Sequence, residues 1–264
     1  MIPRLVASPL TAALVALIAG AAAAHDPALR PRFDLLLLFA AYLLALIALE
    51  MRIAHGHAAK GRGRTVALAG LALLAGVTLV AVRGWPGFWI VGTLGLLALA
   101  FVTGPRLADT SLGGAVTVAV LGPLTTAGAA LAVVGHVSPT ALWIGLPIGL
   151  LADAARRARD TAAHEGHGVH ARIGESPAAP PWFLGDLVAA FGAIPAMVAL
   201  GTLPWIALVS WTTLPWALGE AARARRGTYV WGEAARRTRR LHLAFALLLA
   251  AAVLIARIIV TRLA

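Results

Sequence analysis

The sequence predicts an all-α polytopic membrane protein with about nine transmembrane helices, and three observations lead to this fold class. Hydrophobic residues make up 60% of the chain and charged residues only 12%, whereas soluble domains carry about 25% charged residues. The apolar residues gather in runs near the ~20 residues that a helix needs to cross a bilayer. Basic residues fall mainly between these runs. We therefore expect residues 1–264 to form a single membrane-embedded helical domain.

The first four apolar runs are separated by polar residues. The first follows Arg4, the second lies between Asp34 and Glu50, and the third and fourth flank residues 83–84. The first run has an alternative interpretation, because Ala22-Ala23-Ala24 resembles a signal-peptide cleavage site. Its apolar stretch is longer than a typical signal core, which favours a retained helix.

Two later stretches, residues 110–152 and 187–219, contain no Lys, Arg, Asp or Glu and are too long for one crossing. Turn signals at Gly135 to Pro139 and at Gly201 to Pro204 divide each of them into two helices. A last run follows residue 240. The expected spans are 5–24, 33–52, 65–82, 85–102, 112–134, 139–155, 183–200, 203–219 and 241–260.

The distribution of basic residues favours nine spans. With the N-terminus inside, 17 of the 22 lysines and arginines fall on the inner side, as the positive-inside rule requires. If the seventh and eighth spans were one helix, the arginines of residues 220–240 would move outside and the bias would nearly vanish. We therefore expect a cytoplasmic N-terminus and a multi-pass protein of the bacterial inner membrane.

Composition narrows the function classes. The chain has no cysteine, so disulfides, thiolate metal sites and cysteine nucleophiles are excluded. The net charge of +11 would suggest nucleic acid for a soluble protein. Here the basic residues flank apolar runs, so the lipid bilayer and its anionic headgroups explain the charge and no nucleic-acid partner is expected.

Two polar segments, one after the second span and one after the sixth, carry the candidate chemistry. Together they hold five of the eight histidines. One face of a continued helix carries residues at spacings of three and four: Asp153, Arg156, Arg157, Asp160 and His164. Such a face suits either an anion site, because arginine binds phosphate oxygens in bidentate fashion, or a row of intrahelical ion pairs. The histidines could also form a transition-metal site.

Short motifs also occur in a characteristic order. They are Thr103-Gly104-Pro105, Ser111 to Gly114, Gly122-Pro123-Leu124, Leu146 to Leu151, Arg159-Asp160, Leu214-Pro215 and Arg240 to Leu243. In this order the chain resembles the UbiA superfamily of intramembrane prenyltransferases, most of all the branch that prenylates 1,4-dihydroxy-2-naphthoate. The resemblance covers nearly the whole chain. It implies a UbiA-like bundle of nine helices, with acidic motifs after helices two and six.

The chain departs from the family at both acidic motifs. Arg159-Asp160 matches the second motif, but His164 replaces a further Asp, and Arg156 and Arg157 replace an Asn pair. The first motif is not recoverable, and only Glu50 supplies a carboxylate there. Because the family's acidic residues hold Mg²⁺ on the prenyl diphosphate, the resemblance implies Mg²⁺ as the cofactor, with Asp160 and His164 as candidate metal ligands.

We therefore expect a divergent UbiA-type prenyltransferase that moves an isoprenoid chain from a polyprenyl diphosphate to an aromatic or other lipophilic acceptor. Glu50 and Asp160 are the candidate catalytic residues. The candidate diphosphate ligands are basic residues that could neutralise the anion without metal: Arg52, Lys60, Arg156, Arg157 and Arg159. The alternative is a non-catalytic protein that binds an isoprenoid or quinone, or a subunit of a membrane complex.

Overall fold

The computed structural model describes residues 3–24, 31–54, 62–103, 111–165, 181–225 and 230–263. These residues form helices and short links, and none of them lies in a strand. The all-α class is therefore confirmed for this part of the chain. In chain order the elements are α1 (Pro3–Ala23), α2 (Phe33–Ala54), α3 (Arg62–Thr103), α4 (Ser111–Ala119), η1 (Val120–Leu124), α5 (Thr125–Val134), α6 (Pro139–Glu165), α8 (Pro181–Ala199), η2 (Trp205–Thr213), α9 (Leu214–Arg225) and α10 (Trp231–Leu263).

Four helical segments of the described residues are long and apolar enough to cross a membrane: Gly63–Leu97, Gly113–Val134, Trp182–Ala199 and Trp231–Val260. Shorter apolar helices cover Thr11–Ala23 and Phe33–Leu49. Their outer faces expose large apolar side chains such as Leu37 and Val188, which water would not favour. The chain thus has the helices of a membrane protein.

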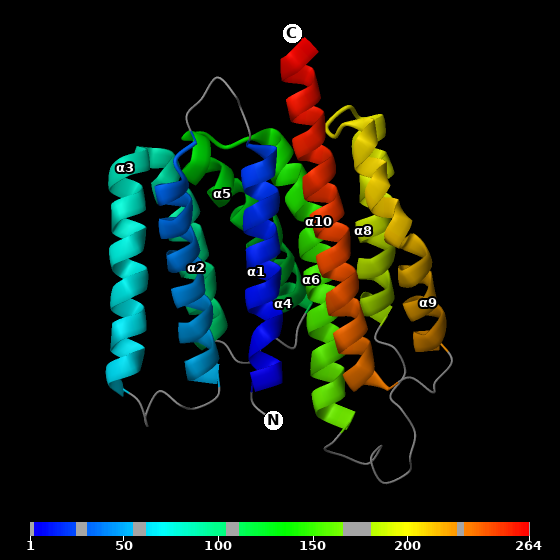
Figure 1. Ribbon diagram of the computed structural model, residues 1–264. Helices are drawn as coiled ribbons and strands as arrows, with labels where there is room; N and C mark the ends of the chain where they lie inside the picture. Colours follow the sequence, from blue (N-terminus) through cyan, green and yellow to red (C-terminus); the bar gives the residue numbers. More distant parts are fainter. Residues whose placement is uncertain are drawn as a thin grey trace.

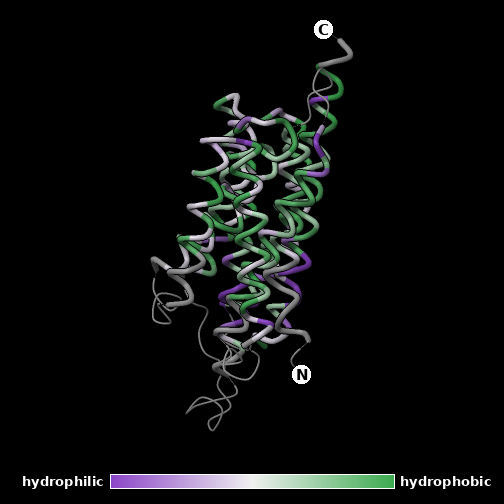
Figure 2. Tube along the Cα trace, turned by 90° about the vertical axis from the view of Figure 1, so that its left-hand side faces the viewer, coloured by the Kyte–Doolittle hydropathy of each residue, from purple (hydrophilic) through white to green (hydrophobic). Residues whose placement is uncertain are grey.

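The helices stand side by side and run alternately in opposite directions (Figure 1). The lower end in that view holds the starts of α1, α8 and α10 and the ends of α2, α6 and α9. Figure 2 shows hydrophilic positions on the lower part of several helices and hydrophobic positions along their middle. We call this lower end the polar end of the bundle.

α3 bends sharply at Gly84, where the sequence separates its third and fourth apolar runs. Gly84 has a φ of 64° and a ψ of −145°, a backbone conformation that side chains with a Cβ rarely adopt. Pro86 follows in the first turn of the descending part. A proline is tolerated there because the N–H groups of a first turn make no intrahelical hydrogen bond. The bend lies at the end opposite the polar end (Figure 1).

The other two predicted breaks are also confirmed. α5 ends at Gly135, whose φ is 87° and whose N–H donates to the Leu131 carbonyl at 2.9 Å, a left-handed cap typical of glycine. α8 ends at Ala199, ahead of Gly201 with a φ of 69°. Extended Pro204 then starts η2.

α6 and α10 are longer than the apolar runs that predicted them. α6 continues about ten residues beyond the expected end at residue 155, and α10 begins ten residues before the expected start at residue 241. Hydropathy marks only the apolar part of a helix, whereas the charged turns continue because their side chains pair at i,i+3 and i,i+4. These charged extensions form much of the polar end.

Glycines bring α6 close to the preceding helix. A Cβ at Gly145 would meet the Pro123 backbone, and one at Gly149 would meet the Val118 backbone. Such close approach of backbones is common in membrane helices with small residues four apart. Pro123 lacks an N–H, and the helix widens into the π-helical turn η1 around it. Thr126 Oγ1 donates to the Ala141 carbonyl of α6 at 2.6 Å, so this contact fixes how α6 is rotated.

The buried apolar residues form two clusters. The larger joins α6, α8, η2, α9 and α10 with one face of α1 and with Ala130 of α5. The smaller joins α2 and α3 with α5 and the other face of α1. Val15 and Ala16 of α1 belong to the larger cluster, and Ala13 and Leu17 to the smaller. α1 and α5 therefore lie between two packed halves.

Candidate functional site

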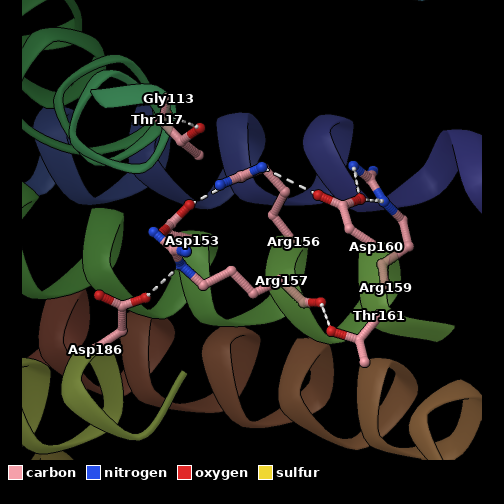
Figure 3. A network of polar contacts seen from close by, with 9 residues as sticks. All are labelled: Gly113, Thr117, Asp153, Arg156, Arg157, Arg159, Asp160, Thr161 and Asp186. Atoms are coloured by element: carbon pink, nitrogen blue, oxygen red, sulfur yellow. Dashed lines mark hydrogen bonds and ion pairs between the residues drawn. The ribbon is translucent and has the colours of Figure 1, made fainter. Parts of the chain in front are cut away.

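Six charged side chains at the polar end make a row of alternating charge, which we call the α6 ion-pair chain. Five of them lie on α6 and one on α8 (Figure 3). Its members, in order of contact, are Asp186, Arg157, Asp153, Arg156, Asp160 and Arg159. Three arginines face three aspartates, so their formal charges cancel.

Asp153 is the centre of this chain. Its carboxylate accepts from Arg156 Nε at 2.8 Å and from Arg157 Nε at 2.6 Å. The helix dictates this geometry, because residues three and four apart share a face. Asp153 is only 1% exposed, and a buried carboxylate requires such partners to offset its lost hydration.

The outer end of the chain is more open. Arg156 Nη1 donates to Asp160 Oδ2 at 3.0 Å, and Arg159 Nη2 lies 3.1 Å from Asp160 Oδ1. The Asp160 side chain is 40% exposed, whereas Arg156 and Arg157 are mostly buried. The chain thus runs from a buried inner part to an exposed outer part.

Asp186 of α8 is a member of this ion-pair chain that the sequence analysis missed. Its Oδ2 accepts from Arg157 Nε at 3.2 Å, so one nitrogen joins the carboxylates of two helices. The sequence does carry a signal, because Asp186 is the single charged residue between positions 181 and 219. An ionisable group in such a run is costly unless it is paired and facing the bundle.

Arg157 also reaches a third element. With its Nε on Asp153 and Asp186, its terminal Nη2 lies against Gly114 in the first turn of α4, where a Cβ would overlap it. The first turn of a helix has backbone N–H groups without helical acceptors and a partial positive charge. Arg157 and the start of α4 therefore place several hydrogen-bond donors with positive charge side by side. Such donors are the groups that bind anions in proteins.

The structure brings together four of the residues predicted for the site: Arg156, Arg157, Arg159 and Asp160. The expectation that Asp153 and Asp160 share a face with the two arginines is confirmed. The alternative interpretation of that face, a row of intrahelical ion pairs, is also confirmed.

The remaining predicted residues lie outside what the structure describes. Lys60 falls in an undescribed segment, as do His55 and His57. Glu50 and Arg52 belong to the last turns of α2, and His164 to the last turn of α6, but the positions of their side chains are not described. Their helices end at the polar end, together with the α6 ion-pair chain (Figure 1).

A Mg²⁺ site does not fit the described residues. Among them, no group of three or more histidines and carboxylates is placed to hold a metal ion. Guanidinium groups lie among the carboxylates, since Arg156 pairs with both Asp153 and Asp160 and Arg157 pairs with both Asp153 and Asp186. In this arrangement arginine stands where a bridging cation would be. The prediction that Asp160 and His164 bind a metal stays a prediction.

A second group of ion pairs ties α9 to α10 at the same end. Glu220 of α9 is fully buried and pairs with Arg223 and with Arg237 Nε, the latter at 3.0 Å. Arg237 Nη1 also donates to Glu233 at 2.9 Å. We call this group the α9–α10 clamp.

Comparison with known proteins leaves the family open: no protein-family model matches the chain, and no curated protein is significantly similar to it. The functional argument therefore rests on the residues and their geometry.

Proposed function

We propose that the chain is a divergent UbiA-type prenyltransferase that binds an isoprenoid diphosphate between the inner part of the α6 ion-pair chain and the start of α4. The observation that carries the proposal is the placement of Arg157. Its Nε is held by Asp153 and Asp186, while its terminal Nη2 lies against the first turn of α4.

This arrangement supports diphosphate binding in two ways. The two aspartates orient the guanidinium before a ligand arrives, so less conformational entropy is lost on binding. The missing Cβ of Gly114 lets the Arg157 guanidinium lie directly against the backbone of α4, close to the helix start, whose N–H groups favour an anion. The apolar bundle beyond would accept the isoprenoid chain and shield a reactive allylic cation from water.

The membrane topology belongs to the same proposal. Nine crossings follow if α3 contributes two crossings on either side of Gly84 and the segment from η2 to α9 contributes one. The polar end then faces the cytoplasm of a bacterial inner membrane, because it collects the basic residues. A water-soluble diphosphate headgroup would reach the site from that side, and a lipophilic acceptor from the bilayer.

A second function is favoured by one specific observation. All three arginines of the α6 ion-pair chain are paired with carboxylates, and an anion must compete with those carboxylates. The second function is a protein that binds an isoprenoid or quinone without catalysis, or that supports a partner in a membrane complex. Such a protein needs no anion to displace the carboxylates from the arginines.

Binding is the first test. Full-length protein in lipid nanodiscs is titrated with farnesyl thiolodiphosphate, which resists ionisation, and with farnesol, which lacks the anion. We expect the diphosphate to bind at least tenfold more tightly than farnesol. Arg157→Gln should abolish that preference, while Arg236→Gln, an exposed arginine on α10 at the same end, should keep it. Equal affinity for the two ligands in the wild-type protein would overturn the proposal.

Turnover separates the two functions. Labelled farnesyl diphosphate is incubated with 1,4-dihydroxy-2-naphthoate, with and without Mg²⁺, and the organic phase is analysed for prenylated product. Product formation supports the transferase. Tight binding of the thiolodiphosphate without any product under either condition favours the non-catalytic alternative.

A further inference from the structure

Two polar side chains on the inner face of α10 each have an atom without a hydrogen-bond partner. Thr238 is fully buried and His242 is 1% exposed. Thr238 Oγ1 and His242 Nε2 are two of the three buried side-chain atoms without a partner in the described part of the chain. Since leaving such a group unsatisfied costs about 1–3 kcal/mol, the pair indicates a bound group.

The two side chains lie close enough to share one ligand. Residues four apart on a helix have Cβ atoms about 5–6 Å apart. The His242 imidazole lies beside the backbone of Ile148 on α6, so both side chains face the α6–α10 contact, one of the most extensive in the molecule.

His242 Nε2 can act in either of two ways. A ring nitrogen of a neutral imidazole accepts a hydrogen bond in one tautomer and donates one in the other. A ligand that can both donate and accept therefore satisfies Nε2 in either tautomer.

A hydroxyl group satisfies both atoms at once. Its O–H donates to His242 Nε2 and its oxygen accepts from the Thr238 hydroxyl, or the two roles exchange where Nε2 donates. A carbonyl or carboxylate cannot donate, and an ammonium cannot accept. Leu241 and Phe245 beside the site are fully buried, which disfavours any charged ligand.

We propose that Thr238 and His242 form a binding site for one hydroxyl group between α10 and α6. Two sources share this chemistry: a water molecule, and the hydroxyl of a lipophilic aromatic alcohol that enters from the bilayer. The site involves none of the residues of the α6 ion-pair chain and does not depend on the proposed transferase activity.

Nitrogen NMR of the full-length protein tests the proposal directly. The protein is labelled with [¹⁵N]histidine in nanodiscs, and the His242 signals are assigned as those missing from His242→Phe, with His136→Phe, an exposed histidine, as the matched control. A bound hydroxyl shifts the Nε2 resonance away from that of an imidazole nitrogen of the same protonation without a partner, to lower frequency where Nε2 accepts. Thr238→Val should reverse part of that shift.

The source of the hydroxyl follows from two probes that differ by one O–H. A further shift with 2-naphthol but none with 2-methoxynaphthalene assigns the site to an aromatic alcohol. A hydrogen-bonded Nε2 that neither probe changes assigns it to water. An Nε2 resonance typical of an unbonded nitrogen under all three conditions would overturn the proposal.

Thermal unfolding gives an independent readout that needs no assignment. Thr238→Val removes only a hydroxyl, so an occupied site predicts a melting temperature about 2–4 °C lower. The matched control is Thr213→Val, whose hydroxyl donates to the Ser210 carbonyl of its own helix at 2.8 Å. A Thr238→Val protein as stable as the wild type, or more stable, would contradict the site.

Discussion

Two buried carboxylates at the polar end, Asp153 and Glu220, make similar ion pairs but differ in what those pairs do. Each carboxylate pairs with two arginines. The partners of Asp153 are 14% and 16% exposed, whereas Arg223 and Arg237, the partners of Glu220, are 47% and 30% exposed. Asp153 thus holds its arginines inside the bundle, and Glu220 holds arginines that still reach water.

The difference lies in what the arginines face. Arg157 Nη2 lies against Gly114 at the start of α4, with the Asp153 carboxylate beside it. Arg237 turns instead to Glu233 on its own helix. A buried carboxylate therefore orients an arginine for a ligand in the α6 ion-pair chain, and joins two helices in the α9–α10 clamp.

The largest effect is expected at Asp153. Asp153→Asn leaves two mostly buried guanidinium groups without their shared carboxylate, which should lower the free energy of unfolding by about 3–5 kcal/mol. Thermal unfolding in detergent, followed by tryptophan fluorescence, measures the loss. A variant as stable as wild type would show that Asp160 and Asp186 alone neutralise the arginines.

Glu220→Gln should have a smaller effect, about 1–3 kcal/mol, because Arg223 and Arg237 can turn toward water when the charge is lost. Binding of farnesyl thiolodiphosphate should not change, since the clamp does not reach α4. The same two assays measure both quantities. Loss of ligand binding in a folded Glu220→Gln protein would erase the distinction between the two groups.

Gly114→Ala tests the contact with α4 at small cost in stability. The added Cβ overlaps Arg157 Nη2 and should weaken diphosphate binding about tenfold, the value of roughly one charge-assisted hydrogen bond. Gly70→Ala is the matched control, because nothing lies within 4 Å of a Cβ there. Unchanged affinity in Gly114→Ala would place the ligand elsewhere.

The smallest effect is expected for the exposed pair at the opposite end. Arg32 donates to Asp34 through Nε at 2.9 Å, and their side chains are 52% and 61% exposed. Asp34→Asn should leave both unfolding and diphosphate binding unchanged, because water and salt screen such pairs. A clear destabilisation would mean that charge pairing alone, without burial, stabilises this bundle.

The sequence predicts the fold better than the site. Gly84, Gly135 and Gly201 mark helix ends by local backbone chemistry, so all three breaks could be read from the chain. The face shared by Asp153 and Asp160 could also be read, since i,i+3 and i,i+4 spacing is a property of one helix.

Contacts between helices could not be read in this way. Asp186 joins the site from α8, 29 residues after Arg157, and that meeting depends on how two helices are rotated. Likewise, Glu220 precedes several arginines, so the sequence indicates only a basic segment there. Its carboxylate is buried because α9 packs against α10. Tertiary geometry decides such pairs, and spacing along the chain does not.

The division of the apolar core by α1 and α5 has a consequence for how the molecule comes apart. Cooperative units of unfolding follow the density of packing, and α2 and α3 pack more extensively on each other than on the rest of the bundle. We expect their amides to exchange with solvent deuterium as one early unit. The half that holds Arg157 and His242 would then stay assembled after the other half has opened.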